Sequence, residues 1–511
     1  MSYAVLANIV SVKTGKPFLQ QIERFGFLPD SPGPNNPHGL PVGMTVVRSR
    51  NARTCGMEMV GFTCAACHVA EIAYQRKHLR IDGAPALIDL QAYQVEFANS
   101  LDATLKDPKK LLALIMAMER SQRGSASSSP ENTSAYATNS SLQQAADVPE
   151  KSNADPAFHS VSSKTADATT QPGKAGLSFG QRIEADLAIL KARLAYLKHG
   201  KLLVTGTEPG PGRIDAFGAA RNLLFSNFAV KMQSPVSFPY IWDVPDYTQK
   251  KVTGADAEWI HYDANTNSIL ERNIGQALGM GAVFDPKTYE STLRPENLHR
   301  LQLLTVKLQP PKWPAEVFGA VDQAKATQGR QIFLDKCQGC HQNHIYDVAE
   351  LGTDPIRAKS FGQPVGSVAF PNAVAPILSG IKKRAFLDDA ISPAEQQQMD
   401  VNPAVWRATG KYLARPLNGI WATAPYLHNG SVPTLYDLLH PEQRPAKFSM
   451  GGREYDPQKI GFAPQTAGVN GLWIFDTTQP GNSNTGHSGD KFGTALSEDQ
   501  KSALLEYLKT I

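Results

Sequence analysis

Two short stretches of the sequence combine cysteine and histidine at a spacing that suits one kind of chemistry. Residues 64–68 read Cys-Ala-Ala-Cys-His, and residues 337–341 read Cys-Gln-Gly-Cys-His. In this pattern the two thiols attach covalently to the vinyl groups of a haem, and the adjacent imidazole binds its iron. The sequence therefore predicts two covalently bound haem c groups, attached at Cys64, Cys67, Cys337 and Cys340, with His68 and His341 as proximal iron ligands.

Pairs of cysteines at this spacing also occur in zinc sites and thiol redox sites. Zinc would bring two such pairs, or one pair and two histidines, into one compact module. Here a histidine follows each pair directly, and the two pairs lie in different halves of the chain. Haem attachment is therefore the favoured interpretation. Cys55, the fifth cysteine, is expected to be a buried, unreactive thiol.

The sixth ligand of each iron decides what the haem can do. An iron with two strong side-chain ligands only passes electrons, whereas an open sixth position can bind and activate O2 or peroxide. His428 and His487 are both candidates for the second haem, and the residue pattern alone does not choose between them. Near the first motif, His78 lies in a basic, exposed-looking stretch and is a weak candidate.

The elements expected to position these residues are mainly helices. A capping box at 497–500 begins a terminal helix, which is expected to cross the helix that leads into the second motif. Further helices are predicted at 109–121, 181–199 and 329–334, a helix or strand at 296–310, and irregular chain at 30–43 and 234–247.

The predicted fold is mostly α, with two cytochrome c-like haem domains, long irregular connections and a disordered insertion. The first haem domain covers 1–121 and continues over 179–320, where the distal pocket and the inter-haem region are expected. Residues 122–178 are polar and of low complexity, so they cannot bury enough apolar surface to offset their ordering entropy. Residues 321–511 form the second, C-terminal haem domain.

Composition and charge restrict the partners. The formal net charge is only +4 over 511 residues, without the basic runs that favour nucleic acid, and no apolar run is long enough for a membrane span. Because haem c is attached outside the cytoplasm, we expect a periplasmic or secreted protein. The first ten residues are apolar but lack the basic leader of a signal peptide, so this expectation comes from the haem chemistry.

Several longer stretches resemble one family. They are Pro-Val-Gly at 41–43, Gly-Phe-Thr-Cys-Ala-Ala-Cys-His at 61–68, Arg-Ile-Asp-Gly-Ala-Pro-Ala-Leu at 80–87, Glu-Arg-Asn-Ile-Gly-Gln-Ala-Leu-Gly at 271–279, and the segment 415–433 that begins Arg-Pro-Leu-Asn-Gly-Ile-Trp. These residues resemble the rubber oxygenase A type of dihaem cytochrome, within the superfamily of dihaem cytochrome c peroxidases and MauG. The resemblance covers most of 25–511 except the insertion.

The resemblance implies a division of labour between the haems. It places O2 at the N-terminal haem, with His68 as proximal ligand, and makes the C-terminal haem bis-histidine, with His487 opposite His341. His428 matches a turn that supports the haem pocket without binding iron. Trp242 is the best match to a tryptophan between the haems that is a proposed electron bridge, and ordinary aromatic packing is its alternative interpretation.

The distal wall of the first haem is expected from residues 259–279. Trp259, Ile269 and Leu270 would supply apolar surface, and Asn265 or Asn267 a hydrogen bond to bound oxygen. The alternative is that this stretch only packs on the porphyrin edge.

Three functions follow from these assignments. The first is an oxygenase that acts with O2 on a small apolar unsaturated substrate. The second is a hydrogen peroxide reductase fed by an external electron donor, which needs a distal acid–base group such as His261, Asp263 or Glu271. The third is an electron carrier without catalytic activity. Calcium is kept as a further candidate cofactor, although the sequence points to no set of ligands for it.

Overall fold

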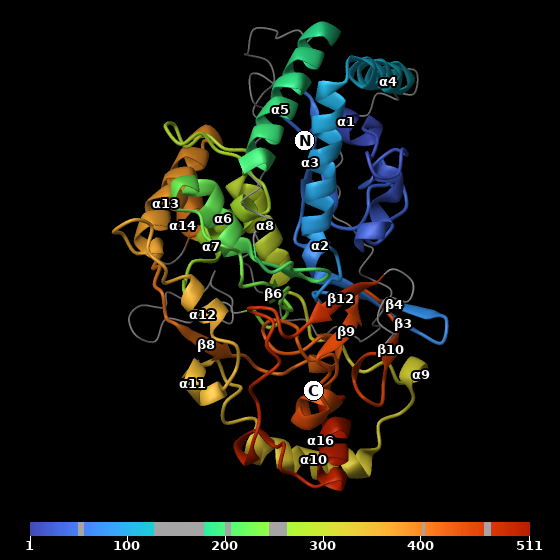
Figure 1. Ribbon diagram of the computed structural model, residues 1–511, viewed down its shortest axis with the longest axis vertical. Helices are drawn as coiled ribbons and strands as arrows, with labels where there is room; N and C mark the ends of the chain where they lie inside the picture. Colours follow the sequence, from blue (N-terminus) through green and yellow to red (C-terminus); the bar gives the residue numbers. More distant parts are fainter. Residues whose placement is uncertain (50–55, 127–177, 200–205, 245–262, 401–403, 464–471) are drawn as a thin grey trace, which may run out of the picture.

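The computed structural model describes residues 1–49, 56–126, 178–199, 206–244, 263–400, 404–463 and 472–511. They form an elongated molecule with the N-terminal helices at one end and the pair α10 (Gln323–Lys336) and α16 (Glu498–Leu508) at the other (Figure 1). Helices dominate the regular structure, and the described strands form six two-stranded antiparallel sheets. The predicted mostly α class is confirmed at this level.

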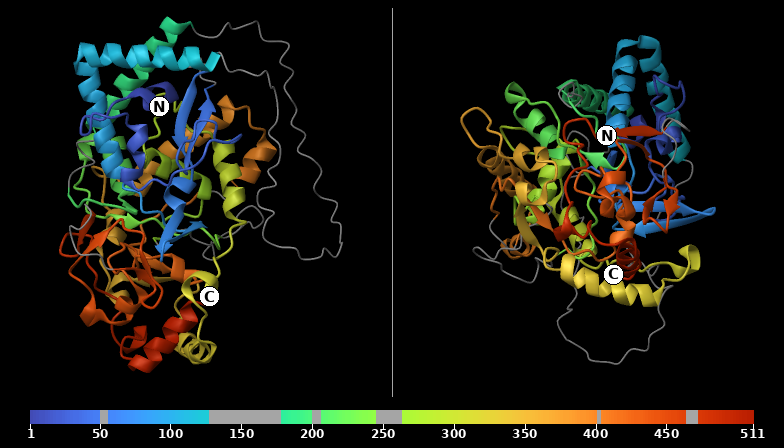
Figure 2. Two further views of the ribbon diagram at one scale, coloured as in Figure 1. Left: turned by 90° about the vertical axis from the view of Figure 1, so that its right-hand side faces the viewer. Right: turned by 60° about the horizontal axis from the view of Figure 1, so that its bottom comes forward.

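The N-terminal end is built on α3 (Leu90–Lys106), which the Asp89 side chain caps by accepting a hydrogen bond from the Ala92 N–H. At Asp107 the chain becomes extended, and Pro108 begins α4 (Pro108–Ala126) at the position where proline is favoured in a helix. Figure 2 shows α4 turned away from α3 at this corner. The other helices here are α1 (Tyr3–Asn8), the 3-10 helix η1 (Leu19–Phe25) and α5 (Phe179–His199).

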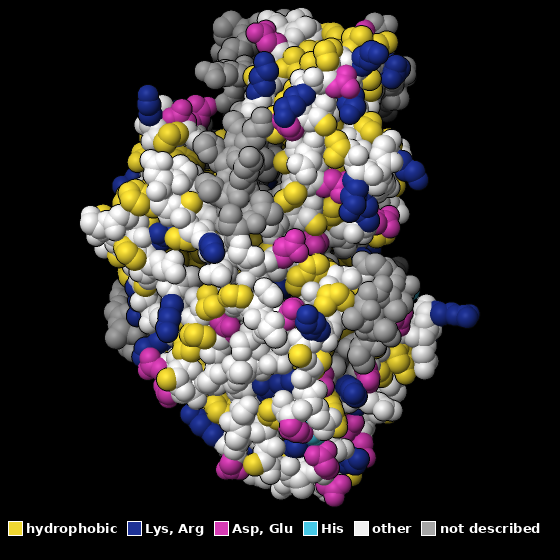
Figure 3. All heavy atoms as spheres, in the orientation of Figure 1, with side chains coloured by type: hydrophobic (Ala, Val, Ile, Leu, Met, Phe, Trp, Pro, Cys, Tyr) yellow, Lys and Arg dark blue, Asp and Glu magenta, His cyan; other side chains and the backbone are white. Residues whose placement is uncertain are grey.

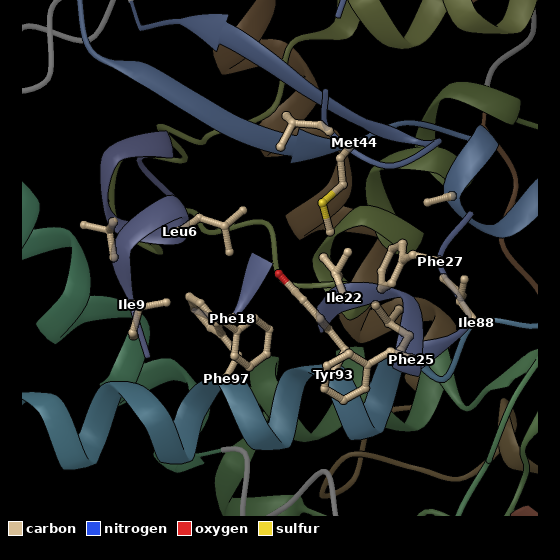
Figure 4. Close-up of a cluster of buried hydrophobic side chains, with 14 of the residues drawn as sticks. Leu6, Ile9, Phe18, Ile22, Phe25, Phe27, Met44, Ile88, Tyr93 and Phe97 are labelled. Carbon is tan, nitrogen blue, oxygen red and sulfur yellow. The ribbon is translucent and has the colours of Figure 1, made fainter. Parts of the chain in front are cut away.

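A buried aromatic cluster holds this end together (Figure 4). Tyr93 and Phe97, one turn apart on α3, meet the Phe18 ring edge-on, with ring centres 5.5 and 5.2 Å away. Such edge-to-face pairs add about 0.5–1.5 kcal/mol each beyond the burial of their area. Leu190 and Leu194 bring α5 into the same core.

The predicted insertion is corrected at its first boundary. Residues 122–126, which were assigned to it, continue α4 to Ala126, because extending a formed helix by one residue costs little once the first turns exist. The remaining residues of the predicted insertion, 127–177, lie outside the described part of the chain. Of the other expected helices, 181–199 is observed as α5.

The middle of the molecule is a second helical layer. Ser268 caps α7 (Ile269–Gly279) by accepting a hydrogen bond from the Glu271 N–H, and Ile274 and Leu278 of this helix pack against Leu378 in a buried core. The element predicted as a helix or strand at 296–310 is helical only as far as Thr305, in α8, and 306–310 are not helical. The helices of this layer are α6 (Ala216–Leu224), α7, α8 (Pro295–Thr305), α13 (Phe370–Asp388) and α14 (Pro393–Met399).

The C-terminal part closes where α10 and α16 cross, as predicted. Ser497 and Gln500 form the expected capping box at the start of α16. Around this pair lie three short antiparallel strand pairs, β7 (His344–Asp347) with β8 (Lys411–Ala414), β9 (Lys447–Met450) with β12 (Trp473–Asp476), and β10 (Tyr455–Asp456) with β11 (Gly461–Phe462). The helices nearby are α9 (Ala315–Phe318), α11 (Val348–Leu351), α12 (Ile356–Ser360) and α15 (Leu435–Leu439).

The hairpin of β3 (Val69–Tyr74) and β4 (Lys77–Asp82) joins the two ends of the molecule. Its Ile72 and Ile81 belong to the same buried cluster as Trp421 and Leu504 of the C-terminal part. The segment that directly follows the first haem motif is therefore part of the core around the second one.

The α10–α16 crossing depends on a glycine. A side chain at Gly329 of α10 would overlap the Ala503 carbonyl of α16. We expect Gly329→Ala to lower the free energy of unfolding by about 1–3 kcal/mol, as overpacking does. Gly180→Ala in α5 is the matched control, because nothing lies within 4 Å of its added methyl group. Denaturant unfolding of both variants tests this, and equal stability would contradict the close crossing.

Candidate functional site: the haem attachment motifs

The first Cys-x-x-Cys-His motif lies between β2 (Glu58–Phe62) and β3 along the chain. β2 pairs with β1 (Met44–Arg48) and leads into Cys64 and the short helix α2 (Ala65–His68). Gly43 lies against α2 with a φ of +83°, and a side chain there would overlap the backbone of Ala66. Only glycine lets the chain pass so closely in this conformation.

His68 is oriented by one of its two ring nitrogens. Nδ1 lies 2.7 Å from the carbonyl oxygen of Pro239, and because a carbonyl only accepts, Nδ1 must carry the ring proton. Burial lowers the pKa of His68 to about 4; the Pro239 hydrogen bond opposes this effect, and the charge of Arg415 adds to it. The ring is therefore neutral at pH 7, with the Nε2 lone pair free for a metal.

A large cavity opens beside this motif. Its volume is about 1140 Å³, and Cys64, Cys67 and His68 line it. A pocket for one small ligand usually measures roughly 300–1,000 Å³, so this cavity lies slightly above the upper end of that range. Its apolar wall comes from α3, α5, α7 and α8, and includes Tyr93, Phe97, Ala185, Ala188, Ile189, Ile269, Ala277, Leu298 and Leu301.

One face of α7 forms a continuous strip of this cavity wall. Ile269, Asn273, Gln276 and Ala277 recur at the spacing of a single helix face and, with the C-cap residue Met280, line the cavity. Asn273 and Gln276 give this wall two side-chain amides, which can donate hydrogen bonds to a ligand.

The second motif lies at the end of α10. Cys337 is the C-terminal cap of this helix, and the His341 N–H bonds the Cys337 carbonyl one turn later. Nδ1 of His341 lies 2.8 Å from the carbonyl oxygen of Arg415, so this nitrogen also carries the proton. Burial lowers the pKa of His341, although the hydrogen bond to the Arg415 carbonyl acts in the opposite direction. Both proximal histidines thus present Nε2 in the neutral form.

His487 lies opposite His341. The two ring centres are 6.4 Å apart, with an angle of 41° between the ring planes. An iron bound by both ring nitrogens at about 2 Å would separate the ring centres by roughly 6 Å. The distance therefore fits a metal between the two imidazoles.

The surroundings of His487 support the same fit. Its imidazole makes no hydrogen bond to the described part of the chain, and its Nδ1 is buried. Burial, His341 and Arg444 lower the pKa of His487 to about 3, which keeps the ring neutral. A buried polar ring without a protein partner is costly. A bond from Nε2 to iron would give this ring one partner, while Nδ1 would still have none among the described residues. The backbone is fixed by Leu351, whose carbonyl accepts from the His487 N–H, and by Arg444, which donates to the Asn484, Gly486 and His487 carbonyls.

His428 is placed differently. Its Nε2 lies 3.0 Å from the hydroxyl of Tyr412, and the two rings stack with centres 4.4 Å apart. The Tyr412 hydroxyl also donates to the Asp354 carbonyl, so His428 is part of a hydrogen-bond chain. Burial lowers its pKa to about 3, aided by the positive charge of Arg357. Because its Nε2 is already engaged, His428 is placed to support the pocket and not to bind iron.

Arg213 connects the loops that carry His428 and His487. It lies in β5 (Arg213–Ile214), which pairs with β6 (Val236–Ser237). Its fully buried guanidinium donates to the Asn429 carbonyl and the Asn482 side chain. Asn429 in turn donates to the carbonyls of Gly481 and Ser483. Burial lowers the pKa of Arg213 to about 9, yet the group stays charged at pH 7.

The residues expected in the distal wall are only partly found there. Ile269 lines the cavity, but Leu270 is buried in the helical core and does not. Asn265 and Asn267 instead accept hydrogen bonds from the backbone N–H groups of Thr409 and Val405 and do not line the cavity, so the structure gives no support to a contact of either with bound oxygen. Their amides are used to join two chain segments. Trp259 lies outside the described residues, as do His261 and Cys55.

The two described acid–base candidates are also engaged elsewhere. Asp263 pairs with Arg272 and Arg357 at 3.2 and 3.6 Å, and neither Asp263 nor Glu271 lines the cavity. Glu271 accepts from Lys382 at 2.6 Å and from the Trp406 indole at 2.7 Å. His78, the weak ligand candidate, is exposed and pairs with Glu71.

Trp242 is fully buried. Its indole N–H donates to the Asn418 carbonyl at 2.8 Å, and its ring stacks on Tyr240 with centres 5.0 Å apart. Tyr240 lines the cavity and Trp242 does not. Asn273, Gln276, Tyr240 and Arg415 are cavity residues that the sequence interpretation missed. The first two could have been found from the face of a helix that begins after Ser268.

Two further expectations concern calcium as a cofactor and the absence of a membrane span. Among the described residues, no group of three or more His, Cys, Asp or Glu side chains is arranged to hold a metal ion, so nothing here supports calcium. None of the described helices is long and apolar enough to cross a membrane. On the face shown in Figure 3, acidic and basic side chains are interspersed without a broad region of one sign.

These features define a c-type cytochrome domain, in which haem c is bound covalently. A family profile described as RoxA-like, cytochrome c-like matches residues 410–449, which include Tyr412, Arg415 and His428. The chain belongs to the same family as "uncharacterized protein y4iJ" of Sinorhizobium fredii (strain NBRC 101917 / NGR234). The two are 30% identical over 580 aligned residues, covering 98% of this chain and 86% of the relative.

A second protein of the same strain, "uncharacterized protein y4iM", is 30% identical over 373 residues, covering 66% of this chain and 79% of its own. Neither name assigns an activity. The RoxA-like match relates this chain to c-type cytochromes and indicates the haem-dependent oxidoreductase class.

Proposed function

We propose that this protein is a periplasmic or secreted dihaem cytochrome oxidoreductase with one reactive and one electron-transfer haem. The reactive haem is held by Cys64, Cys67 and His68, and the electron-transfer haem by Cys337, Cys340, His341 and His487. The observation that carries the proposal is the contrast between the two sites. His341 has a second imidazole 6.4 Å away, whereas the described lining of the cavity beside His68 contains no second histidine.

The proposed substrates are O2 and a small apolar unsaturated molecule. The cavity is larger than a single-ligand pocket, and its walls on α3, α5, α7 and α8 are mostly apolar. When bound, the haem iron supplies the site where O2 is activated. The side chains of this chain would exclude water, hold the apolar substrate, and orient bound oxygen through the amides of Asn273 and Gln276.

The alternative of a hydrogen peroxide reductase has less support. Breaking the O–O bond of peroxide to give two waters takes two protons, and two electrons from an external donor. Asp263 and Glu271 are committed to buried ion pairs away from the cavity. Cleavage of a carbon–carbon double bond by O2 places both oxygen atoms in two carbonyl products and needs no net external reductant. The apolar cavity favours this second reaction.

Carbon monoxide binding tests the contrast between the haems. The reduced protein is expected to bind one CO per two haems, because only the haem at His68 has a free sixth position. Haem content is measured on the same sample by pyridine haemochrome and intact mass. Two bound CO, or one haem per chain, would contradict the proposal.

An electron carrier would instead bind no CO. Met44, Met59 and Met280 line the cavity and could supply a sixth ligand in that case. The variants Met44→Leu, Met59→Leu and Met280→Leu would then create CO binding that the wild type lacks. If CO does bind, uptake of O2 with squalene as an apolar alkene probe, compared with peroxide consumption in the presence of a reduced dye, separates oxygenase from peroxidase.

A further inference from the structure

The proximal histidines of the two motifs are hydrogen-bonded to two chain segments that touch each other. His68 donates from Nδ1 to the Pro239 carbonyl, and His341 donates from Nδ1 to the Arg415 carbonyl. Pro239 precedes Tyr240, and the side chains of Tyr240 and Arg415 are in direct contact. The two histidines are thus connected through a single pair of residues.

Tyr240 and Arg415 hold each other's segment in place. The Arg415 guanidinium lies over the Tyr240 ring, 3.8 Å from its centre, and donates to the backbone carbonyls of Tyr240 at 2.9 Å and Trp242 at 3.3 Å. In return, the Tyr240 hydroxyl donates to the Pro416 carbonyl. Both side chains line the cavity with His68.

We propose that the Tyr240–Arg415 pair is a positioning latch that sets the hydrogen bonds of both proximal histidines at once. This inference rests on the proposed function, because it requires a haem at each motif. Movement of either segment would displace the carbonyl that accepts from His68 or the one that accepts from His341. The same contacts make a continuous connection between the two haem sites, from His68 through Pro239, Tyr240 and Arg415 to His341.

The physical effect of such a latch is on the reduction potential. A firm hydrogen bond from Nδ1 to a carbonyl makes the imidazole a stronger electron donor to iron. A stronger donor favours the oxidised iron and lowers the potential. Loosening the latch therefore raises both potentials. The charge of Arg415 acts in the opposite sense, because removing a cation near iron disfavours the reduced state and lowers the potential.

Arg415→Lys separates these two effects. Lysine keeps the charge but cannot donate in a planar fork or stack on Tyr240 in the same way. We expect the midpoint potentials of both haems to rise in Arg415→Lys, and a smaller rise in Tyr240→Phe, which loses only the bond to Pro416. Arg453→Lys is the matched control, because Arg453 also joins distant segments through Glu71 and the Gly26 carbonyl but does not line the cavity.

The readout is a spectroscopic redox titration of the haem-loaded full chain, with haem content measured in each variant. Arg415→Gln also removes the positive charge of Arg415 and serves for comparison. Unchanged potentials in Arg415→Lys with lowered potentials in Arg415→Gln would show a purely electrostatic role and overturn the latch. A shift at one haem only would also overturn it. If Arg415→Lys does not load haem, the midpoint potentials of Tyr240→Phe decide whether the latch exists. A wild-type protein with a single haem would refute the proposed function itself.

Discussion

Replacing His487 with alanine is expected to convert the second haem from low spin to high spin. His341 and His487 are the only pair of described histidine rings placed to hold one iron between them, at a ring separation of 6.4 Å. Losing one of two strong axial ligands weakens the ligand field and opens the sixth position. Because the first haem is proposed to lack a sixth protein ligand already, the high-spin share should rise from about half of the haem in the wild type to all of it in the variant, in optical and electron paramagnetic resonance spectra. It should also bind two CO where the wild type binds one.

His428→Gln is the matched control. His428 is as deeply buried as His487, but its Nε2 is engaged by Tyr412, and glutamine keeps a hydrogen-bonding side chain at this position. We expect the second haem to stay low spin in this variant. If His428→Gln becomes high spin while His487→Ala remains low spin, the assignment of the axial ligand is reversed.

Replacing Lys382 with methionine is expected to lower the free energy of unfolding by about 3–5 kcal/mol, the usual effect of removing one partner from a buried ion pair. The Lys382 ammonium lies between the carboxylates of Glu271 and Asp400, and its side chain is only 10% exposed. Without it, two buried carboxylates face each other uncompensated. The loss would loosen α7, which carries both Glu271 and the amides of the cavity wall.

Lys383→Met provides the control, because the neighbouring lysine is exposed and its loss should change stability by about 0.5 kcal/mol or less. Chemical denaturation of all three proteins measures the difference. Equal stability of Lys382→Met and Lys383→Met would mean that the buried pair is not formed.

The pH dependence gives a further check on Lys382. Burial alone would lower its pKa, but Asp400 and Glu271 outweigh burial and leave the pKa raised from 10.5. When the pKa of a group is higher in the folded than in the unfolded protein, its full contribution to stability is present at pH values below the unfolded-state pKa. This contribution is lost as the pH rises through the folded-state pKa. The stability gap between wild type and Lys382→Met should therefore be constant near neutral pH and narrow above about pH 10.5.

The sequence alone determined the features that depend on neighbouring residues. Haem attachment follows from five adjacent residues, because the thioether bonds and the proximal imidazole must fit one edge of the porphyrin. Helix ends follow from caps within one turn, so the start of α16 at the Ser497 capping box was predicted correctly. The crossing of α10 and α16 was expected because small cytochrome c domains usually close in this way, and residues of both helices meet in one buried cluster.

The tertiary structure decided which distant side chains meet. From the sequence, His428 and His487 were equal candidates until a family resemblance separated them, and the choice depends on which ring Tyr412 engages. Asn265 and Asn273 are the same residue type eight positions apart, yet one joins two segments and the other lines the cavity. The contact of Tyr240 with Arg415 joins residues far apart in the chain. No local pattern encodes such pairings, because they depend on how the packed cores orient each backbone segment.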